Sequence, residues 1–551
     1  MLLTVPSLLA LLSAPLSQVV GGNNEQLHHW IGSASVSAFG YAVAPAGDVN
    51  SDGYNDVLIG EPFYDAGAVT DKGAFRVASG LDGSLLFRMT GSANILKLGA
   101  SLANAGDVNG DGIADFIVGA PTSTAGGTER GAVLLFSGSD FSLIRSHEGL
   151  NDFEQFGHAV STIGDLNRDG YADYAVGSPL ASNTFGTVHL YSGIDGALLQ
   201  KLTGGITHQL GYSVAAAGDV NADGFPDILV GSPNANNRFG IAAVYSGRSG
   251  LVIREFHGDP AGIRPQMGYS VSPAGDLNLD GYDDVLIGAA RYGVSEDGAA
   301  YAYSGIDGSL MFEWHGTTRA WFGSAVTALD DLNGDSIPDI IVGAPRCDVG
   351  TMTWAGKAYA YSGLDGSQVL ELSGQTDSGH FGWSLADAGD IDGDFVGDPI
   401  IGAPGPLDGS GRGAVFIHSF HPFLRINQPG VSVNNGGLLE FTVAFPPNAA
   451  GMPYKILLSK TGTGPSWYGV QIPLNRDAWT NDSYLGIYPV NSHNNMHGNL
   501  NPYARAYASM TLPPNLPWSA VGKTFYFAAI VEPVGGPAQW SSVAVPLMVV
   551  P

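Results

Sequence analysis

One nine-residue pattern, Asp-x-Asn/Asp-x-Asp-x-x-x-Asp, occurs seven times in this chain of 551 residues. The copies begin at residues 48, 107, 165, 219, 276, 331 and 390, so that successive copies lie 54 to 59 residues apart. Almost every copy is followed by a short apolar run that ends in Gly-x-Pro. A chain with this regularity is expected to build one structural unit seven times.

The pattern places oxygen ligands at alternate positions of a tight loop, which is the arrangement that Ca²⁺ requires. The side chains at positions 1, 3, 5 and 9 and the backbone carbonyl at position 7 are the predicted ligands, by analogy with the first nine positions of an EF-hand loop. We expect up to seven Ca²⁺ ions with a structural role, because seven near-identical sites cannot each be an active site. In sequence order the predicted metal ligands are Asp48, Asn50, Asp52, Tyr54, Asp56, Asp107, Asn109, Asp111, Ile113, Asp115, Asp165, Asn167, Asp169, Tyr171, Asp173, Asp219, Asn221, Asp223, Phe225, Asp227, Asp276, Asn278, Asp280, Tyr282, Asp284, Asp331, Asn333, Asp335, Ile337, Asp339, Asp390, Asp392, Asp394, Val396 and Asp398.

The segments after the loops predict β-strands. Each loop is followed by a short run of consecutive apolar, often β-branched residues, which is typical of a strand covered on both faces. Further along each repeat, an Asp-Gly turn separates two more apolar segments and predicts a hairpin. Four short strands in a period of this length are typical of one propeller blade. The sequence therefore predicts an all-β fold, a seven-bladed β-propeller over residues 23–421, with helix content near zero.

The two ends of the repeat array complement each other. The seventh copy has three predicted strands, and Pro422 follows where the Asp-Gly turn and fourth strand should begin. At the other end, the segment 27–32 precedes the first loop by the spacing that separates a fourth strand from the next loop, but it has no blade of its own. We predict that this N-terminal strand completes the seventh blade and closes the ring, which removes two open sheet edges.

The acidic balance excludes one class of partner. The chain has 51 acidic and 23 basic residues and a net charge of -28, and the predicted ligand positions hold 22 of the acids. Seven bound Ca²⁺ ions would halve that charge and remove local repulsion. Nucleic acid is excluded as a partner because no basic stripe is present to contact phosphates. Cys347 is the single cysteine and is interpreted as a small buried residue.

Residues 1–22 form an apolar leader that predicts a secretory signal peptide, although it lacks a basic residue near its start and its cleavage position is ambiguous. No segment reaches the ~20 uninterrupted apolar residues of a transmembrane helix. Extracellular calcium modules bind Ca²⁺ with Kd values of roughly 0.1–1 mM, so that they are filled at the calcium concentration outside a cell. We therefore expect a secreted or cell-surface, extracellular protein.

Two further motifs recur around each loop. An apolar-Gly pair stands before it, as in Phe39-Gly40, and Gly-Ala-Pro or a close variant stands after it, as in 119–121. Together they resemble the FG-GAP repeats of the integrin α-subunit β-propeller, over about residues 26–421. The resemblance implies calcium loops between the first two strands of a blade, on one face of the disc. In integrins the opposite face meets the partner subunit and ligand, but no motif here carries that property over.

The last two copies depart from the pattern. Copy six has Ser336 where the turn glycine stands, and a non-Gly residue with positive φ costs on the order of 1 kcal/mol. Copy seven has Phe395 at that position and an additional carboxylate, Asp392, at position 3. We expect weaker binding in copy six and leave the occupancy of both sites open.

The composition changes after residue 423. Residues 425–551 contain no acidic loop, and four apolar segments in them read as strands of a small β-sandwich-like domain. Between these segments lies an aromatic and amide-rich stretch around Trp479, which fits either core packing or a glycan or partner site.

No catalytic motif is present: the chain lacks His-Glu-x-x-His, a Gly-x-Ser-x-Gly elbow and a Walker loop. The sequence therefore favours an adhesion or ligand-binding module whose propeller face binds a protein or glycan. Two alternatives stay open, a carbohydrate-active enzyme such as a polysaccharide lyase and a structural component of a surface assembly. Convergent His, Arg and Tyr at the propeller centre would favour the enzyme, and a flat aromatic rim would favour binding. The ligand and the oligomeric state are not specified by the sequence.

Overall fold

The computed structural model describes most of residues 22–422 and parts of the remainder. The described ranges are 22–33, 37–65, 70–92, 94–181, 185–205, 208–258, 265–293, 295–333, 335, 337–392, 396–405, 411–422, 424–426, 430–432, 437–445, 452–459, 493–494, 496–500, 505–512, 524–531, 540–541 and 545–550. The predicted signal peptide and the aromatic stretch around Trp479 lie outside these ranges. Two compact units are present, one of residues 24–421 and one of residues 1–23 with 422–551.

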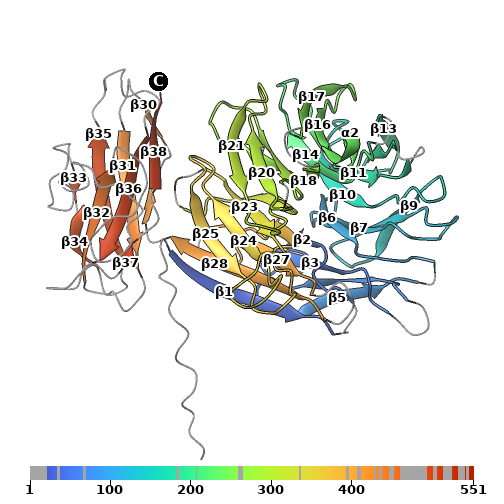
Figure 1. Cartoon of the computed structure of the whole chain (residues 1–551), viewed down its shortest axis with the longest axis horizontal. Helices are drawn as coiled ribbons and strands as arrows, with labels where there is room; N and C mark the ends of the chain where they lie inside the picture. Colours follow the sequence, from blue (N-terminus) through green and yellow to red (C-terminus); the bar gives the residue numbers. More distant parts are fainter. Residues whose placement is uncertain are drawn as a thin grey trace, which may run out of the picture. The chain divides into compact units, whose positions relative to one another are not determined.

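The larger unit is a ring of seven four-stranded antiparallel sheets, which confirms the predicted seven-bladed propeller (Figure 1). Strand bounds for the first four blades are β2 (Val43–Gly47), β3 (Asp56–Glu61), β4 (Ala74–Ala78) and β5 (Leu85–Thr90); β6 (Ser101–Gly106), β7 (Asp115–Ala120), β8 (Ala132–Phe136) and β9 (Leu143–Glu148); β10 (Ala159–Gly164), β11 (Asp173–Ser178), β12 (Thr187–Tyr191) and β13 (Leu198–Thr203); β14 (Ser213–Gly218), β15 (Asp227–Ser232), β16 (Ile241–Tyr245) and β17 (Val252–His257).

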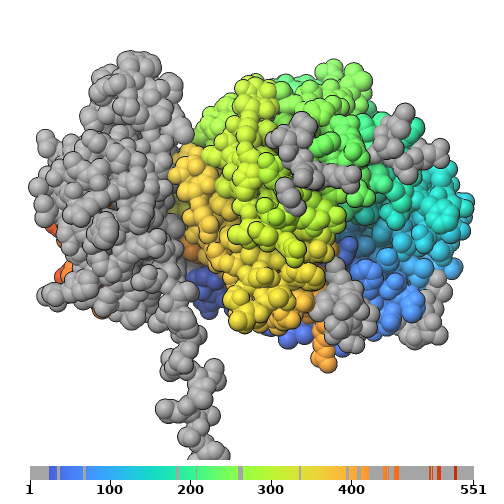
Figure 2. Space-filling view, in the orientation of Figure 1, coloured from blue at the N-terminus to red at the C-terminus, as the bar shows by residue number. Residues whose placement is uncertain are grey.

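Blades 5 and 6 follow the same order, and blade 7 takes its fourth strand from the N-terminus. Their strands are β18 (Met267–Gly275), β19 (Asp284–Ala289), β20 (Ala299–Tyr303) and β21 (Leu310–His315); β22 (Val326–Leu329), β23 (Asp339–Ala344), β24 (Lys357–Tyr361) and β25 (Gln368–Ser373); β26 (Ser384–Asp387), β27 (Pro399–Ala403), β28 (Ala414–Pro422) and β1 (Gly22–Ile31). Helix in the described residues is limited to Ala181 and α2 (Ala235–Arg238), in which Asn236 and Asn237 have left-handed backbone angles. In Figure 2 the colours change in sequence order around this unit.

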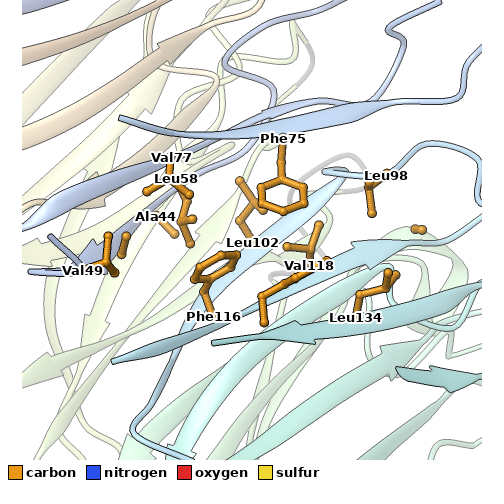
Figure 3. Close-up of a cluster of buried hydrophobic side chains, with 13 residues drawn as sticks. Ala44, Val49, Leu58, Phe75, Val77, Leu98, Leu102, Phe116, Val118 and Leu134 are labelled. Atoms are coloured by element: carbon orange, nitrogen blue, oxygen red, sulfur yellow. The ribbon is translucent and has the colours of Figure 1, made fainter. Parts of the chain in front are cut away.

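Burial explains the two kinds of strand pattern in each blade. The second strand is buried at every position, as in β3, β7 and β11, because neighbouring blades cover both of its faces. The fourth strand is largely half-buried or exposed, as in β5, because it lies at the outer edge. The core consequently lies between blades. Phe75 of blade 1 packs on Phe116 of blade 2 with ring centroids 5.8 Å apart, in the cluster of Figure 3.

The two glycine motifs form the contact between neighbouring blades. A Cβ atom on Gly60, of the Gly-x-Pro motif in blade 1, would lie 2.1 Å from the carbonyl oxygen of Gly99, of the apolar-Gly pair in blade 2. Only glycine permits this approach of two backbones. The same contact closes the ring, since a Cβ on Gly402 of blade 7 would lie 2.2 Å from the oxygen of Gly40 in blade 1.

The N-terminal strand closes the ring as predicted. β1 pairs with β28, and the indole of Trp30 in β1 donates a hydrogen bond to the carbonyl of Gly83 in the hairpin turn of blade 1, at 2.8 Å. Outer strands elsewhere make the same contact with the next blade: Arg145 donates to the carbonyl of Gly193 at 3.0 Å, and Trp314 to that of Gly366 at 2.9 Å. The seventh blade therefore has a complete set of contacts although its strands come from both ends of the ring.

The smaller unit contains two further sheets. One has the order β29 (Leu424–Ile426), β31 (Gly437–Ala444), β35 (Arg505–Leu512) and β33 (His493–Asn494). The other contains β30 (Gly430–Ser432), β38 (Val545–Val550), β36 (Thr524–Val531), β32 (Pro453–Ser459) and β34 (His497–Asn499), with β37 (Trp540–Ser541) beside β36. Phe441 of the first sheet and Phe527 of the second lie with ring centroids 5.0 Å apart, so buried aromatic residues join the two sheets.

Candidate functional site

The acidic loops connect the first and second strands of their blades, and their hydrogen bonds explain the spacing of the pattern. In the first copy, the carboxylate of Asp48 accepts hydrogen bonds from the backbone N–H groups of Asp52 and Gly53, at 3.0 and 2.9 Å. Asp52 in turn accepts from the N–H of Tyr54 at 3.0 Å. Gly53 has φ of 93°, as its predicted role in the sharp turn requires.

Four further copies repeat these bonds, and copy six repeats two of them. The carboxylates at position 1 that accept in this way are Asp107, Asp165, Asp219, Asp276 and Asp331. The residues at position 7 that donate to the carboxylate at position 5 are Ile113, Tyr171, Phe225, Tyr282 and Ile337. The loop is therefore one local structure. Its sixth position in copies six and seven, Ser336 and Phe395, lies outside the described residues.

The aspartate at position 9 is fully buried in all seven copies, namely Asp56, Asp115, Asp173, Asp227, Asp284, Asp339 and Asp398. Asp56 accepts hydrogen bonds from the N–H of Val49 at 3.0 Å and from the N–H of Gly80 at 3.1 Å. Burial raises the pKa of Asp56 to about 6 and that of Asp227 to about 7, although these backbone bonds lower it. A buried carboxylate that is costly to ionise is one that a bound cation would stabilise.

The side chain at position 3 joins the other ligand positions. In copy two the amide nitrogen of Asn109 lies 3.0 Å from an oxygen of Asp111 and 3.3 Å from an oxygen of Asp115. Positions 3, 5 and 9 thus converge, with an amide N–H group as the positive partner of two carboxylates. A calcium ion would supply that positive charge more strongly, and the oxygen donors present are those it prefers. The residues therefore fit the predicted ion.

Copy seven contains three carboxylates that could share one cation. The oxygens of Asp390, Asp392 and Asp398 lie within 4.8 Å of one another. This copy differs because Asp392 replaces the usual asparagine. Val396 lies in the described part of the loop, whereas Asp394 lies outside it.

One part of six of these sites was not predicted from the sequence. The N–H group that binds Asp56 belongs to a Ser79-Gly80 dipeptide at the end of the third strand, and the Ser79 hydroxyl lies 3.4 Å from Asp52. A Cβ on Gly80 would lie 1.9 Å from the carbonyl oxygen of Asn55, so no other residue fits. A signal was available, because the same Ser-Gly dipeptide stands at residues 137, 192, 246, 304 and 362.

A central cavity of about 270 Å³ lies at the other end of the first strands. Each first strand begins near the apolar-Gly pair and ends at the acidic loop, so the cavity and the loops lie on opposite faces of the ring. The residue after the apolar-Gly pair contributes to the cavity in every blade; these residues are Tyr41, Ala100, His158, Tyr212, Tyr269, Ser324 and Trp383. This set could not be predicted from the repeat pattern because its residue type changes from blade to blade.

Aromatic contacts shape the cavity wall. Ring centroids are 5.6 Å apart for Tyr41 and Trp383, 5.3 Å for Tyr212 and Tyr269, and 4.8 Å for His158 and Tyr212. Burial raises the pKa of Tyr41 to about 12 and lowers that of His158 to about 4. Both groups are consequently neutral at physiological pH, and the wall can offer hydrogen bonds and flat apolar faces to a ligand.

No helix in the part of the chain that the structure describes is long and apolar enough to cross a membrane.

Six segments match the FG-GAP repeat family, at residues 39–77, 98–136, 156–191, 210–247, 267–303 and 322–361. Each segment covers the apolar-Gly pair, acidic loop and following strands of one of blades 1–6. Blade 7, with its altered loop and borrowed strand, lies outside the matched segments.

Curated relatives match over part of the propeller. Integrin alpha-5 of Xenopus laevis is 30% identical over 235 residues, which are 38% of this chain and 22% of that protein. Integrin alpha-V of Gallus gallus is 32% identical over 218 residues, 35% of this chain and 20% of that protein. Phosphatidylinositol-glycan-specific phospholipase D of Rattus norvegicus is 32% identical over 204 residues, 32% of this chain and 24% of that protein. The aligned regions thus span less than a quarter of the length of each of these relatives.

Proposed function

Because this chain is an FG-GAP repeat protein distantly related to integrin alpha subunits, we propose that it is a calcium-stabilised propeller that binds a protein or glycan ligand. The observation that carries this proposal is the central cavity, to which every blade contributes the residue after its apolar-Gly pair. The identities of these residues vary while the framework repeats, so the framework does not dictate them. A concave site with aromatic walls and a few polar groups is suited to binding.

Calcium has a structural role in this proposal. The ligands are the side chains at positions 1, 3, 5 and 9 of each loop, with a backbone oxygen at position 7, and up to seven ions bind. Buried carboxylates such as Asp56 and Asp227 support the assignment, as does the convergence around Asn109. Since the loops lie on the face away from the cavity, the ions hold the blades in register and do not contact the ligand.

Extracellular location follows from the same proposal. The leader at residues 1–22 has the composition of a signal peptide, and calcium sites of this kind are filled outside cells. We assign residues 23–421 to the propeller domain and residues 425–551 to a C-terminal β-sandwich-like domain, whose role is not specified by this proposal.

A ligand screen with matched variants tests the proposal. The full chain, in calcium, is applied to a glycan array and to a panel of immobilised extracellular-matrix proteins. Tyr212→Ala and Trp383→Ala should each weaken binding of at least one ligand found by about tenfold or more, since both remove an aromatic wall of the cavity. Leu251→Ala, at an exposed hairpin turn, should leave binding unchanged. Full binding by both cavity variants, or no ligand on either array, would contradict the proposal.

An enzyme is the second candidate, because the central cavity brings together His158, Tyr41, Tyr212 and Lys97. Polysaccharide lyases need a base and an acid with pKa values near the working pH. The pKa of His158 is lowered to about 4 and that of Tyr41 is raised to about 12, which favours binding over proton transfer. Release of unsaturated products from acidic polysaccharides, lost in His158→Ala, would reverse this preference.

A further inference from the structure

A second, open groove lies on the same face of the ring as the central cavity, between loops of blades 5 and 6. Its volume is about 1090 Å³, and it shares no lining residue with the central cavity. Pockets of ~300–1,000 Å³ hold drug-sized ligands, so this groove has room for a short oligomer. Two tryptophans, Trp321 and Trp354, and two arginines, Arg319 and Arg346, line it together with Glu296 and Asp348.

Stacking fixes the centre of the groove. The guanidinium carbon of Arg346 lies 3.5 Å from the ring centroid of Trp321 and 5.1 Å from that of Trp354. The Trp321 indole donates a hydrogen bond to Glu296 at 3.0 Å, which holds its ring in place. Cation–π stacking orients a planar guanidinium while its N–H groups stay available for hydrogen bonds in its plane.

The described acids of the groove form no ion pair with these arginines. Glu296 binds Trp321 and lies 3.8 Å from Arg291, and Asp348 accepts the backbone N–H of Trp354 at 2.9 Å. Among the described carboxylates none forms an ion pair with Arg319 or Arg346, and the buried Nε atom of Arg346 has no hydrogen-bond partner. In a chain of net charge -28, two unpaired guanidinium groups in one groove are suited to an anion.

The repeat framework does not require this pair of residues. Trp321 precedes the apolar-Gly pair, and Arg346 follows the Gly-Ala-Pro motif of the same blade. In blade 4 the same two positions are occupied by Gln209 and Asn234, whose side-chain amides hydrogen-bond to each other. A pair of amide side chains thus suffices to join these loops. The fold therefore does not explain why blade 6 has Trp321 and Arg346 at these positions.

We propose that the groove between blades 5 and 6 binds an acidic saccharide, with a sugar ring on the face of Trp354 and its carboxylate on Arg346 and Arg319. Trp354 is 43% exposed, so an aromatic face is available for the C–H groups of a pyranose. Hydroxyl side chains along the groove, including Thr318 and Thr353, can bind sugar hydroxyls. A uronic acid offers all three complementary features, whereas a peptide carboxylate offers no apolar ring face. The site lies outside the central cavity and therefore goes beyond the function proposed above.

Titration calorimetry with the full chain in calcium tests this inference. The probes are a hyaluronan tetrasaccharide, which carries uronate, chitotetraose as its neutral counterpart, and an aspartate-containing tetrapeptide. We expect binding of the first probe only. Trp354→Ala and Arg346→Lys should each weaken it by about tenfold or more, because one removes the stacking face and the other the planar fork.

Matched variants separate this site from the central cavity and from the fold. Gln209→Ala, at the equivalent position of blade 4, should bind the tetrasaccharide as the parent does, and so should Tyr212→Ala, even if the proposed function of the cavity fails. Equal affinity for chitotetraose would overturn the acidic specificity, and binding of the peptide alone would overturn the ligand class. The proposed site would be overturned if no probe bound, or if the Trp354→Ala and Arg346→Lys variants each bound the tetrasaccharide with full affinity.

Discussion

Removing calcium should destabilise the propeller by an amount that can be worked out from its loops. Each position-9 aspartate is fully buried, and burial raises the pKa of Asp56, Asp115 and Asp284 from 3.8 to about 6. Because the pKa of an acid is raised by folding, stability without a cation is lost as the pH rises from 3.8 through 6, and the loss is complete at pH 7.5. For these three aspartates it amounts to at most about 3 kcal/mol per site.

A bound ion offsets a cost of this size. With ~10 mM free calcium and a Kd of roughly 0.1–1 mM, each site contributes RT ln(1 + [Ca²⁺]/Kd), about 1.4–2.7 kcal/mol. Seven independent sites would contribute about 10–19 kcal/mol. For a unit of about 400 residues, with an unfolding entropy of ~2.1 cal/mol/K per residue, this corresponds to about 12–23 °C in Tm.

Differential scanning calorimetry of the full chain, in EDTA and in calcium at pH 7.5, measures this difference. Asp219→Asn should reduce the number of bound ions by one and the calcium-dependent shift in Tm by about 2–3 °C. Asp82→Asn, which removes an exposed charge in a hairpin turn, should change neither. A shift in Tm of less than about 2 °C on chelation, or the same ion count in Asp219→Asn as in the parent, would refute the assignment of the loops.

Two further predictions concern ring closure and acid stability. Deletion of residues 23–34 should lower the Tm far more than an ordinary terminal trim, because it opens the seventh blade and removes the bond from Trp30 to Gly83; an unchanged Tm would contradict the closure. Burial lowers the pKa of His189 and His418 to about 4, so these groups should cost stability as the pH falls from 6.5 to 4, and His189→Gln should reduce that slope in urea unfolding curves at several pH values.

The ring could be predicted from the sequence because the residues that join neighbouring blades are the same in almost every repeat. Gly60 and Gly99 allow two backbones to approach closely, and no other residue type fits at these positions. The motif therefore recurs in the sequence with the same residues. Counting the predicted strands of each repeat likewise revealed the missing fourth strand of the seventh repeat and the additional strand before the first.

The sites were predicted in part, for reasons of distance and of chemistry. Asp48, Asp52 and Asp56 are close in sequence, so their convergence could be expected, whereas Gly80 binds Asp56 from 24 residues further along the chain. The central cavity and the groove beside Trp354 escaped prediction because they use repeated positions with changing residues. A repeat pattern reveals the residues that every blade requires for its fold, whereas a binding surface depends on residues that differ between blades.

The N-terminal strand that completes blade 7 also brings the two ends of the ring together. Asn24 and His418 lie side by side, with Oδ1 of the first 3.1 Å from Nδ1 of the second, so the chain enters and leaves the ring at one blade. A protein whose ends meet can be inserted into a loop of another chain without a spacer. The propeller is thereby a module that a host chain can gain or lose as one piece, at a single point along its path.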